Sequence, residues 1–247
     1  MGIRPYMDMN QTNHSSLLTP HSSFFSVAID GPSGAGKTTM SRLVAREMGF
    51  LYVDTGALYR ALGLLAVRKG VDPNDEACVR ALLPEAEVSL SHDESGQRVF
   101  LCGKDVTEAI RAHEISRAAS DISALPAVRA FLLDTQRAFA HTQDVIMDGR
   151  DIGTVVLPDA SLKIFLTAAP EDRARRRYGE LRARGAMIDF ETVLADLRIR
   201  DINDASRVAA PLKPAADAVI LDTTGNTIEQ SVGIILDLVR RKYAPPG

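Results

Sequence analysis

The nine residues from Gly31 to Thr39, GPSGAGKTT, constrain this chain more than any other segment. They match the phosphate-binding loop pattern G-x-x-x-x-G-K-[ST] at every fixed position. The apolar run FSVAID at 25–30 precedes the loop and is typical of a buried strand, and apolar residues at helical spacing follow it as far as Gly49. In such a setting, curled backbone N–H groups and a helix N-terminus bind phosphate oxygens. The segment therefore predicts a nucleoside triphosphate site.

The side chains of this loop have separate expected roles. Lys37 is expected to reach the β- and γ-phosphates, and the Thr38 hydroxyl is expected to face a Mg²⁺ ion. The residues expected to contact bound ATP are Gly31, Pro32, Ser33, Gly34, Ala35, Gly36, Lys37, Thr38 and Thr39. The alternative is a chance glycine-rich turn, which the flanking strand and helix patterns argue against.

Composition argues against several classes of partner. The 247 residues carry a net charge of −3, which gives no general attraction to nucleic acid or to an anionic membrane. No apolar stretch approaches the length that spans a bilayer. Cys78 and Cys102 form neither a close pair nor a zinc-type spacing, so we expect buried free thiols in a reducing cytosol. These features predict a cytoplasmic protein, which we expect to be a monomer with neither nucleic-acid nor membrane partners.

Residues 1–23 differ from the rest of the chain. They are rich in Ser, Thr, Asn and His, show no periodicity, and contain a single basic residue, Arg4. A secretory signal needs a continuous apolar core, and a mitochondrial leader needs several arginines. We therefore expect a disordered N-terminal extension at 1–23, followed by a folded domain over 24–247.

Beyond the loop, strand and helix patterns alternate. Short, almost continuously apolar runs predict further strands at 51–54, 144–148, 162–166 and 218–222. Helical patterns occupy about 56–69, 127–140, 170–184, 190–206 and 227–242. This alternation predicts an α/β fold with a five-stranded parallel sheet and helices on both faces. Asp30, Asp54 and Asp148 fall at the carboxyl ends of strands, where such sheets bind ligands.

One region interrupts this alternation. Residues 88–91 and 98–101 form alternating runs around the turn sequence DESG, which is typical of a hairpin. We interpret about 72–113 as an inserted sub-domain, outside the main sheet, that helps to cover a second substrate. A purely structural flap is an equally good interpretation.

A second polar segment follows the strand at 144–148, with the sequence DGRDIGT. An acid at the end of an apolar strand is typical of the element that orients Mg²⁺ in phosphate-loop proteins, so Asp148 is a candidate metal ligand together with Thr38. The guanidinium of Arg150 could grip a phosphate through two hydrogen bonds. The alternative is an ordinary turn with an Arg–Asp pair.

Arginines are concentrated in the predicted helices that follow. Four of them begin one helix: Arg173, Arg175, Arg176 and Arg177. Arg200, Asp204 and Arg207 share one face of the next helix. A solvated, salt-bridged face is the usual interpretation of such charge. Their density on a nucleotide-binding fold favours contact with phosphate instead.

Several of these segments resemble the bacterial cytidylate kinase family. They are IDGPSGAGK at 29–37, DTGALYR at 54–60, DGRDIGTVV at 148–156, PDA at 158–160, RD at 200–201 and APL at 210–212, and the likeness is collinear over about 25–242. The resemblance implies a P-loop nucleoside-monophosphate-kinase fold with a small β-containing monophosphate-binding insert and a mobile helical lid at about 170–207. It also implies ATP-dependent phosphorylation of CMP and dCMP to CDP and dCDP, with Mg²⁺.

The resemblance further implies roles for individual residues. Those expected around the cytosine are Thr55, Ser120, Arg129, Asp151 and Arg207. Those expected near the acceptor phosphate are Arg60, Arg150 and Arg207, with Arg200 and Asp204 near the sugar. Arg173, Arg176 and Arg177 belong to the lid by the same analogy, and Lys37, Arg150 and Arg177 are the expected catalytic residues. Ala205 stands where the family often has Ser, which bears on sugar preference only.

Other functions remain to be weighed against a monophosphate kinase. A GTPase or ATP-driven switch would need a guanine-reading Asn-Lys-x-Asp segment, which this sequence lacks. A catalytically silent nucleotide-binding module would not need Lys37, Arg150 and Asp151. Kinases of shikimate or dephospho-coenzyme A share the phosphate-binding loop but lack the segments 54–60 and 148–151 in combination.

Overall fold

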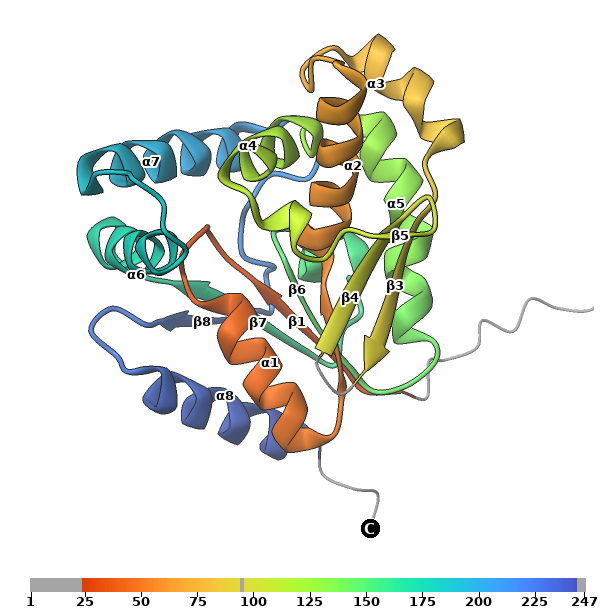
Figure 1. The fold of residues 1–247 in the computed structure, drawn as a ribbon. Helices are drawn as coiled ribbons and strands as arrows, with labels where there is room; N and C mark the ends of the chain where they lie inside the picture. The colour runs from red at the N-terminus through yellow and green to blue at the C-terminus, as the bar shows by residue number, and fades with distance from the viewer. Residues whose placement is uncertain (1–23, 94–95, 244–247) are drawn as a thin grey trace, which may run out of the picture.

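Strands and helices alternate along residues 24–93 and 96–243, which the computed structural model of this chain describes (Figure 1). The main-sheet strands are β1 (Ser26–Asp30), β2 (Leu51–Asp54), β6 (Val145–Gly149), β7 (Leu162–Thr167) and β8 (Val219–Asp222). The expected disordered extension at 1–23 lies outside the described residues, as do the hairpin residues 94–95 and the tail 244–247.

The described residues form a five-stranded parallel sheet in the order β2-β6-β1-β7-β8, as the sequence predicts. The register pairs Asp30 with Gly149 and Asp54 with Asp148 on neighbouring strands. Because the strands are parallel, their carboxyl ends meet at one edge of the sheet. The predicted convergence of Asp30, Asp54 and Asp148 is therefore confirmed.

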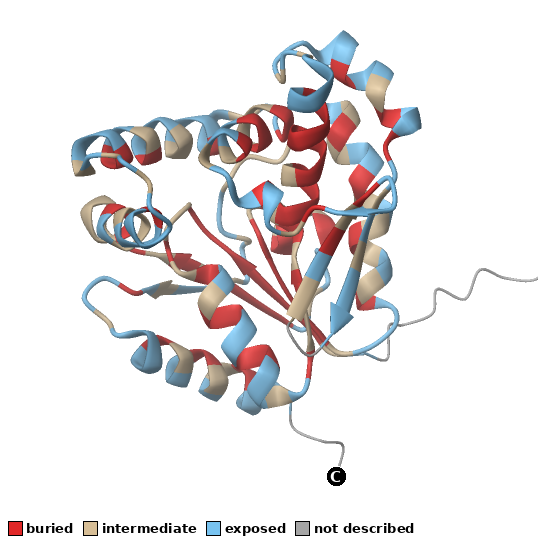
Figure 2. Cartoon of the chain, in the orientation of Figure 1, coloured by how far each residue is buried: buried red, intermediate tan, exposed pale blue. Residues whose placement is uncertain are grey.

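Helices cover both faces of this sheet, because alternate side chains of its buried strands point to opposite sides. On one face, Val27 and Ile29 pack with α1 (Lys37–Met48) and α8 (Ile228–Lys242). On the other face, Ala28 and Met147 pack with α5 (Pro126–Ala140) and the short helix η3 (Ile152–Val156). Figure 2 shows the central strands as a continuous buried layer between these helices.

The region between β2 and β6 carries a second sheet. The hairpin strands β3 (Val88–Asp93) and β4 (Gly96–Leu101) pair with the short β5 (Lys104–Asp105) in a three-stranded antiparallel sheet. The helices around it are α2 (Thr55–Lys69), α3 (Glu76–Leu82), η1 (Leu83–Glu85), η2 (Ala109–Arg111) and α4 (His113–Ile122). Buried residues of this sheet share a hydrophobic core with α2, α4 and α5.

Two side chains tie this hairpin to the edge strand β2. His92 Nε2 donates to the carbonyl of Tyr52 at 2.8 Å, and the Asp54 N–H donates to Gln97 Oε1 at 2.8 Å. Gln97 Nε2 also donates to the Asp54 carbonyl at 3.3 Å. The hairpin is therefore anchored to the end of β2, beside the predicted site.

The predicted lid corresponds to α6 (Pro170–Ala183) and α7 (Phe190–Ser206). These two helices pack against each other through a small core of their own, made by Ala174, Leu181, Val193, Leu194 and Leu197. In Figure 1, α7 lies next to α4, and α6 lies below α7. None of the helices within the described residues is both long and apolar enough to traverse a lipid bilayer.

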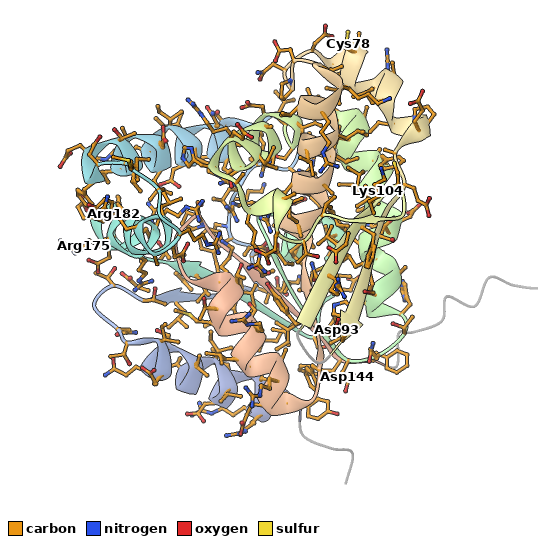
Figure 3. The ribbon with its side chains drawn as sticks, in the orientation of Figure 1. Cys78, Asp93, Lys104, Asp144, Arg175 and Arg182 are labelled. Atoms are coloured by element: carbon orange, nitrogen blue, oxygen red, sulfur yellow. The ribbon has the colours of Figure 1, made fainter. Side chains whose placement is uncertain are left out.

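The structure corrects the prediction for the cysteines. Cys78 and Cys102 are free, as expected, but both are exposed, so the expectation that they are buried was wrong. Figure 3 shows Cys78 on the outer end of the molecule, on α3. Only one residue of this short helix, Val79, is buried, because α3 covers a corner of the core with a single side chain.

Candidate active site

The phosphate-binding loop runs from the end of β1 to the start of α1, as the motif requires. Gly31 has a φ of 149°, and a Cβ built there would lie 2.0 Å from the Leu166 carbonyl oxygen, so only glycine fits between the two strands. Lys37, the first residue of α1, is 6% exposed, and its Nζ donates to the Pro32 carbonyl at 2.8 Å. Burial, followed by the positive charge of Arg150, lowers the pKa of Lys37. A bound phosphate would place a negatively charged partner beside this ammonium.

Thr38 and Asp148 lie together at the mouth of this loop. The Thr38 hydroxyl donates to Asp148 Oδ2 at 3.2 Å, and the Tyr52 hydroxyl donates to Oδ1 at 2.8 Å. Burial and the nearby charge of Asp54 raise the pKa of Asp148. A hydroxyl and a carboxylate are the hard oxygen ligands that Mg²⁺ accepts while keeping several waters. No cluster of three or more His, Cys, Asp or Glu that could hold a metal occurs in the part of the chain described.

Arg150, which is predicted to contact the acceptor phosphate, lies at the carboxyl end of β6, the strand that carries Asp148. Arg150 follows β6 directly, and its Nε donates to Asp204 Oδ2 on α7 at 2.8 Å. The nearby Arg200 is partly buried, and desolvation together with the charge of Arg150 lowers its pKa to about 10. Within residues 24–93 and 96–243, Arg200 Nε and the Nε and Nη2 groups of Arg207 are buried without a hydrogen-bond partner. Unpaired buried N–H groups are costly, so this cluster is suited to an anionic ligand.

Asp151 lies at the other side of the same tip. Its carboxylate pairs with the guanidinium of Arg129 on α5, and both side chains are largely buried. Arg129 also stacks over the ring of Tyr59 at 5.7 Å from the ring centroid, and its Nη1 donates to the Ser123 carbonyl at 3.1 Å. Ser123 Oγ in turn accepts from Arg207 Nη1 at 3.2 Å. Asp151, Arg129 and Arg207 therefore form one connected polar group, and their contact with a cytosine stays a prediction.

Thr55 and Arg60 come from the start of α2. The Thr55 hydroxyl is buried and donates to the Asp148 carbonyl at 2.8 Å. Arg60 Nη2 pairs with Asp54 Oδ2 at 2.6 Å, and Asp54 Oδ1 accepts the Ala57 N–H at the beginning of the helix. The hydroxyl proton of Thr55 is therefore used to hydrogen-bond the end of β6, and the guanidinium of Arg60 is paired with Asp54.

A cavity of about 290 Å³ lies among α4, α6, α7 and the phosphate-binding loop. Residues lining it include Ser33, Ser120, Arg177, Leu197, Arg200 and Asn203. Four predicted site residues therefore meet there, namely Ser33, Ser120, Arg177 and Arg200. Thr55 and Arg60 on α2, and Asp151 after β6, are predicted site residues that are not part of this lining.

All four arginines at positions 173–177 of α6 have protein partners. Arg173 donates to both carboxylate oxygens of Asp201 at 3.0 and 2.7 Å and to the Ser33 carbonyl at 3.1 Å. Arg176 donates to the carbonyls of Ala35 and Thr223. Arg175 lies on the outer side of α6 and pairs with Asp172 (Figure 3). Arg177 Nη1 pairs with Glu180 Oε2 of the same helix at 3.1 Å, and its expected phosphate contact stays a prediction. Arg173 and Arg176 join α6 to the phosphate-binding loop.

Comparison with known proteins decides the family. The sequence model of the cytidylate kinase family matches residues 27–241. The chain belongs to the cytidylate kinase family. Two similar relatives bear the name cytidylate kinase, from Pelotomaculum thermopropionicum (52% identity, 87% of this chain and 95% of that protein) and from Pseudomonas paraeruginosa (50% identity, 85% and 93%). A solved shikimate kinase from Acinetobacter baumannii is a distant likeness, with a TM-score of 0.41 and 16% identity over 90% of this chain and 96% of that one. This member of the family is accordingly a kinase.

Sequence reasoning missed several residues that build the site. Ser123 connects two arginines, Asp201 holds Arg173, and Gln97 holds the end of β2. Nothing in a single sequence distinguishes these polar residues from surface ones. Asp30 was placed correctly at a strand end, yet its partners, the N–H groups of Ile152 and Gly153, are 122 and 123 residues away along the chain.

Proposed function

We propose that this chain transfers the γ-phosphoryl group of ATP to CMP and dCMP, giving ADP with CDP or dCDP. The observation that carries the proposal is the buried arginine cluster: Arg200 and Arg207 keep N–H groups without partners in the described residues, next to Arg150. Two anionic groups must be brought together in this reaction, and such a cluster offsets their repulsion. The relatives named cytidylate kinase support the identity of the acceptor.

ATP binds the loop from Gly31 to Thr39 in this proposal. The backbone N–H groups and Lys37 hold the β- and γ-phosphates, and the start of α1 adds partial positive charge. Thr38 and Asp148 would hold Mg²⁺, directly or through water, and the ion supplies further neutralisation of phosphate charge. Tyr52 fixes the rotamer of Asp148 through its hydroxyl.

Phosphoryl transfer here needs no general base. An oxygen of the acceptor phosphate is already anionic at neutral pH and attacks the γ-phosphorus of ATP in line. The new bond joins that oxygen to the γ-phosphorus, and the bond to the bridging oxygen breaks, leaving ADP. Lys37, Arg150 and Arg177 stabilise charge on the transferring group, and closure of α6 and α7 excludes water.

The acceptor binds between the tip of β6 and the helices α4 and α7. Arg60, Arg150 and Arg207 hold its phosphate, and Arg200 and Asp204 hold its sugar. The base is read by a group of polar side chains, namely Thr55, Ser120, Arg129, Asp151 and Arg207. The ion pair of Asp151 with Arg129 supports this assignment, because it places a carboxylate and a guanidinium side by side in a largely buried position.

A monomeric, cytoplasmic enzyme that acts on small molecules is part of the proposal. The exposed free thiols of Cys78 and Cys102 suit a reducing compartment. The net charge of −3 gives no support to nucleic-acid binding.

The test is release of ADP in a coupled assay with CMP, dCMP, UMP, AMP, GMP and shikimate as acceptors, and with no acceptor. We expect CMP and dCMP to be phosphorylated at least about a hundredfold more efficiently than UMP. ADP release that is slow and independent of any acceptor would instead indicate a nucleotide switch. A second acceptor used equally well would indicate a kinase of other specificity.

Variants separate the site from its surroundings in the same assay. Arg200→Ala should lower kcat/KM for CMP by about a hundredfold or more, because a buried cationic contact is removed. Arg175→Ala is the matched control, since Arg175 pairs only with the neighbouring Asp172 at the exposed side of α6. Equal losses in both variants would show that general charge, not the arginine cluster, sustains activity.

A further inference from the structure

Asp30 joins the two loops of the site. It is the last residue of β1 and directly precedes the phosphate-binding loop at Gly31. Its carboxylate nevertheless contacts a different segment: Oδ1 accepts the Ile152 N–H at 2.8 Å and Oδ2 accepts the Gly153 N–H at 2.8 Å. The residue is 4% exposed. One side chain thus links the strand that leads into the donor loop with the segment that carries Arg150 and Asp151.

The two N–H groups are those that a helix leaves unpaired at its start. Ile152 and Gly153 are the first residues of η3, and first-turn N–H groups have no partner within their own helix. The usual cap would be the residue before them, Asp151, whose residue type is a favoured N-cap. Asp151 makes no side-chain cap to this helix and pairs with Arg129 instead. Asp30 supplies the cap from another strand, and the carboxylate of Asp151 faces Arg129 instead of its own helix.

We propose that Asp30 is a positioning residue for phosphoryl transfer, which holds the peptides of Ile152 and Gly153 so that Arg150 and Asp151 point at the acceptor nucleotide. This rests on the proposed function, in which Arg150 holds the acceptor phosphate and Asp151 reads the base. Both residues lie between Gly149, which pairs with Asp30 in the sheet, and Ile152, which is bonded to its side chain. The segment is therefore fixed at both ends by a single residue of β1.

A purely structural role would not require a carboxylate at this position. Val27, Ala28 and Ile29 precede it in a strand with no exposed residue, and a buried carboxylate is costly even when it is hydrogen-bonded. Burial raises the pKa of Asp30 to about 6, although the two backbone N–H groups and the charge of Lys37 oppose this. An acceptor with two oxygens is needed only because two adjacent N–H groups must be held.

The test is Asp30→Asn, which keeps the shape of the side chain but leaves one oxygen for two N–H donors. We expect KM for CMP to rise at least about tenfold, since a hydrogen bond to a charged acceptor is lost and the loop loosens. We also expect the preference for CMP over UMP to fall at least about fivefold, because Asp151 is no longer held. KM for ATP should change by less than about twofold, since the donor loop keeps its own backbone contacts.

The matched control is Asp217→Asn. Asp217 is exposed and pairs with Lys163, whose side chain lies beside Gly153. The substitution therefore removes a nearby negative charge but leaves the hydrogen bonds to the N–H groups of Ile152 and Gly153 intact. This variant should keep the kinetic constants of the unmutated enzyme. Unchanged KM for CMP and unchanged base preference in Asp30→Asn would overturn the proposal. An equal rise of KM for ATP and CMP would overturn it too, because Asp30 would then act through the donor loop.

A readout without substrate separates this proposal from the proposed function. Hydrogen exchange of the amides in the peptide 150–156 should be at least about tenfold faster in Asp30→Asn, with the peptide 31–40 unchanged. Unchanged exchange at 150–156 would overturn the positioning role whatever the substrate is. Failure of the unmutated enzyme to phosphorylate CMP would reject the proposed function alone. If Asp30→Asn does not fold, Asp30→Glu keeps the charge while displacing the carboxylate, and the same shifts are expected from it.

Discussion

Arg150 Nε donates to Asp204 Oδ2 at 2.8 Å, and this ion pair joins the tip of β6 to α7 across 54 residues of sequence. Arg150 Nη1 also donates to the Gly149 carbonyl at 3.2 Å. The charge of Asp204 raises the pKa of Arg150 against the effect of burial, and Arg150 and Arg200 in turn lower the pKa of Asp204. The tip of β6 and α7 are therefore connected through one largely buried charge pair.

Replacing Arg150 by lysine tests this connection. Lysine keeps the charge but makes no planar pair of contacts, so Arg150→Lys should lower kcat/KM for CMP by at least about tenfold. The loss should exceed any change in KM for ATP, as measured by initial rates with each substrate varied. Arg175→Lys serves as the control outside the site. A loss confined to ATP binding would place Arg150 on the donor side.

Lys37→Ala tests the donor loop. The ammonium is buried beside the Pro32 carbonyl, where it can neutralise charge that develops between the β- and γ-phosphates. We expect turnover to fall by at least about a hundredfold while the thermal unfolding transition remains cooperative. A folded variant with near-normal turnover would contradict the assigned role of the loop.

The central strands of the main sheet were predictable because they are buried on both faces, whereas the edge strand β8 has the same apolar sequence pattern but is mostly exposed, so its predicted burial was wrong. β1 contains no exposed residue and β6 is buried throughout, so both appear in the sequence as short, apolar runs. α4 was not predicted, although Ile115, Ala118, Ala119 and Ile122 have helical spacing and are buried. Alanines mark a helix face weakly, because the same residue type is common in loops and on surfaces.

The positions of the motif residues in the fold were predictable, whereas their hydrogen-bond partners were not. Lys37, Arg150 and Asp148 are brought together at the strand ends by parallel pairing. The partner of an arginine is not visible in its sequence: Arg173 binds a carboxylate and backbone carbonyls, whereas Arg200 keeps a free N–H among the described residues. Only the tertiary structure shows which guanidinium N–H groups are hydrogen-bonded within the described residues and which are not.

The hairpin is expected to affect acceptor binding through Gln97. Its side chain bonds the backbone of Asp54, and Asp54 holds Arg60 at 2.6 Å. Gln97→Ala should therefore raise KM for CMP by about threefold to tenfold, with little change in kcat, because one positioning contact is lost. Steady-state kinetics with CMP as the varied substrate measure this change in KM. Gln136→Ala is not a suitable control, because Gln136 is buried. An unchanged KM for CMP would support the interpretation of the hairpin as a structural flap.

Base selection is expected to depend on Asp151. An ionised carboxylate accepts hydrogen bonds only, so it pairs with the amino group of cytosine and opposes the carbonyl of uracil. Asp151→Asn should narrow the preference for CMP over UMP by at least about tenfold, because an amide can donate to that carbonyl. The ratio of the two kcat/KM values is the readout, since loss of the Arg129 ion pair lowers both. A ratio equal to that of the unmutated enzyme would remove Asp151 as the base reader.

The stability of the fold should depend on pH through Asp30. Burial raises its pKa from an ordinary value of 3.8 to about 6, so the folded chain holds this proton more tightly than the unfolded chain does. The stabilisation is therefore present at low pH and lost as the pH rises through about 6, with a total change of about 3 kcal/mol.

Urea unfolding of the unmutated protein and of Asp30→Asn should show this titration. Relative to the variant, the unmutated protein should lose about 2 kcal/mol between about pH 4.5 and about pH 7.5, because asparagine does not titrate. Asp217 gives the opposite sign, since its hydrogen bond from Lys163 lowers its pKa and its stabilisation is lost as the pH falls. A constant difference between the unmutated protein and Asp30→Asn would show that Asp30 is ionised in the fold at no cost. A pH-dependent difference would show that the carboxylate of Asp30 is kept, at a cost in folding free energy, beside the segment that carries Arg150 and Asp151.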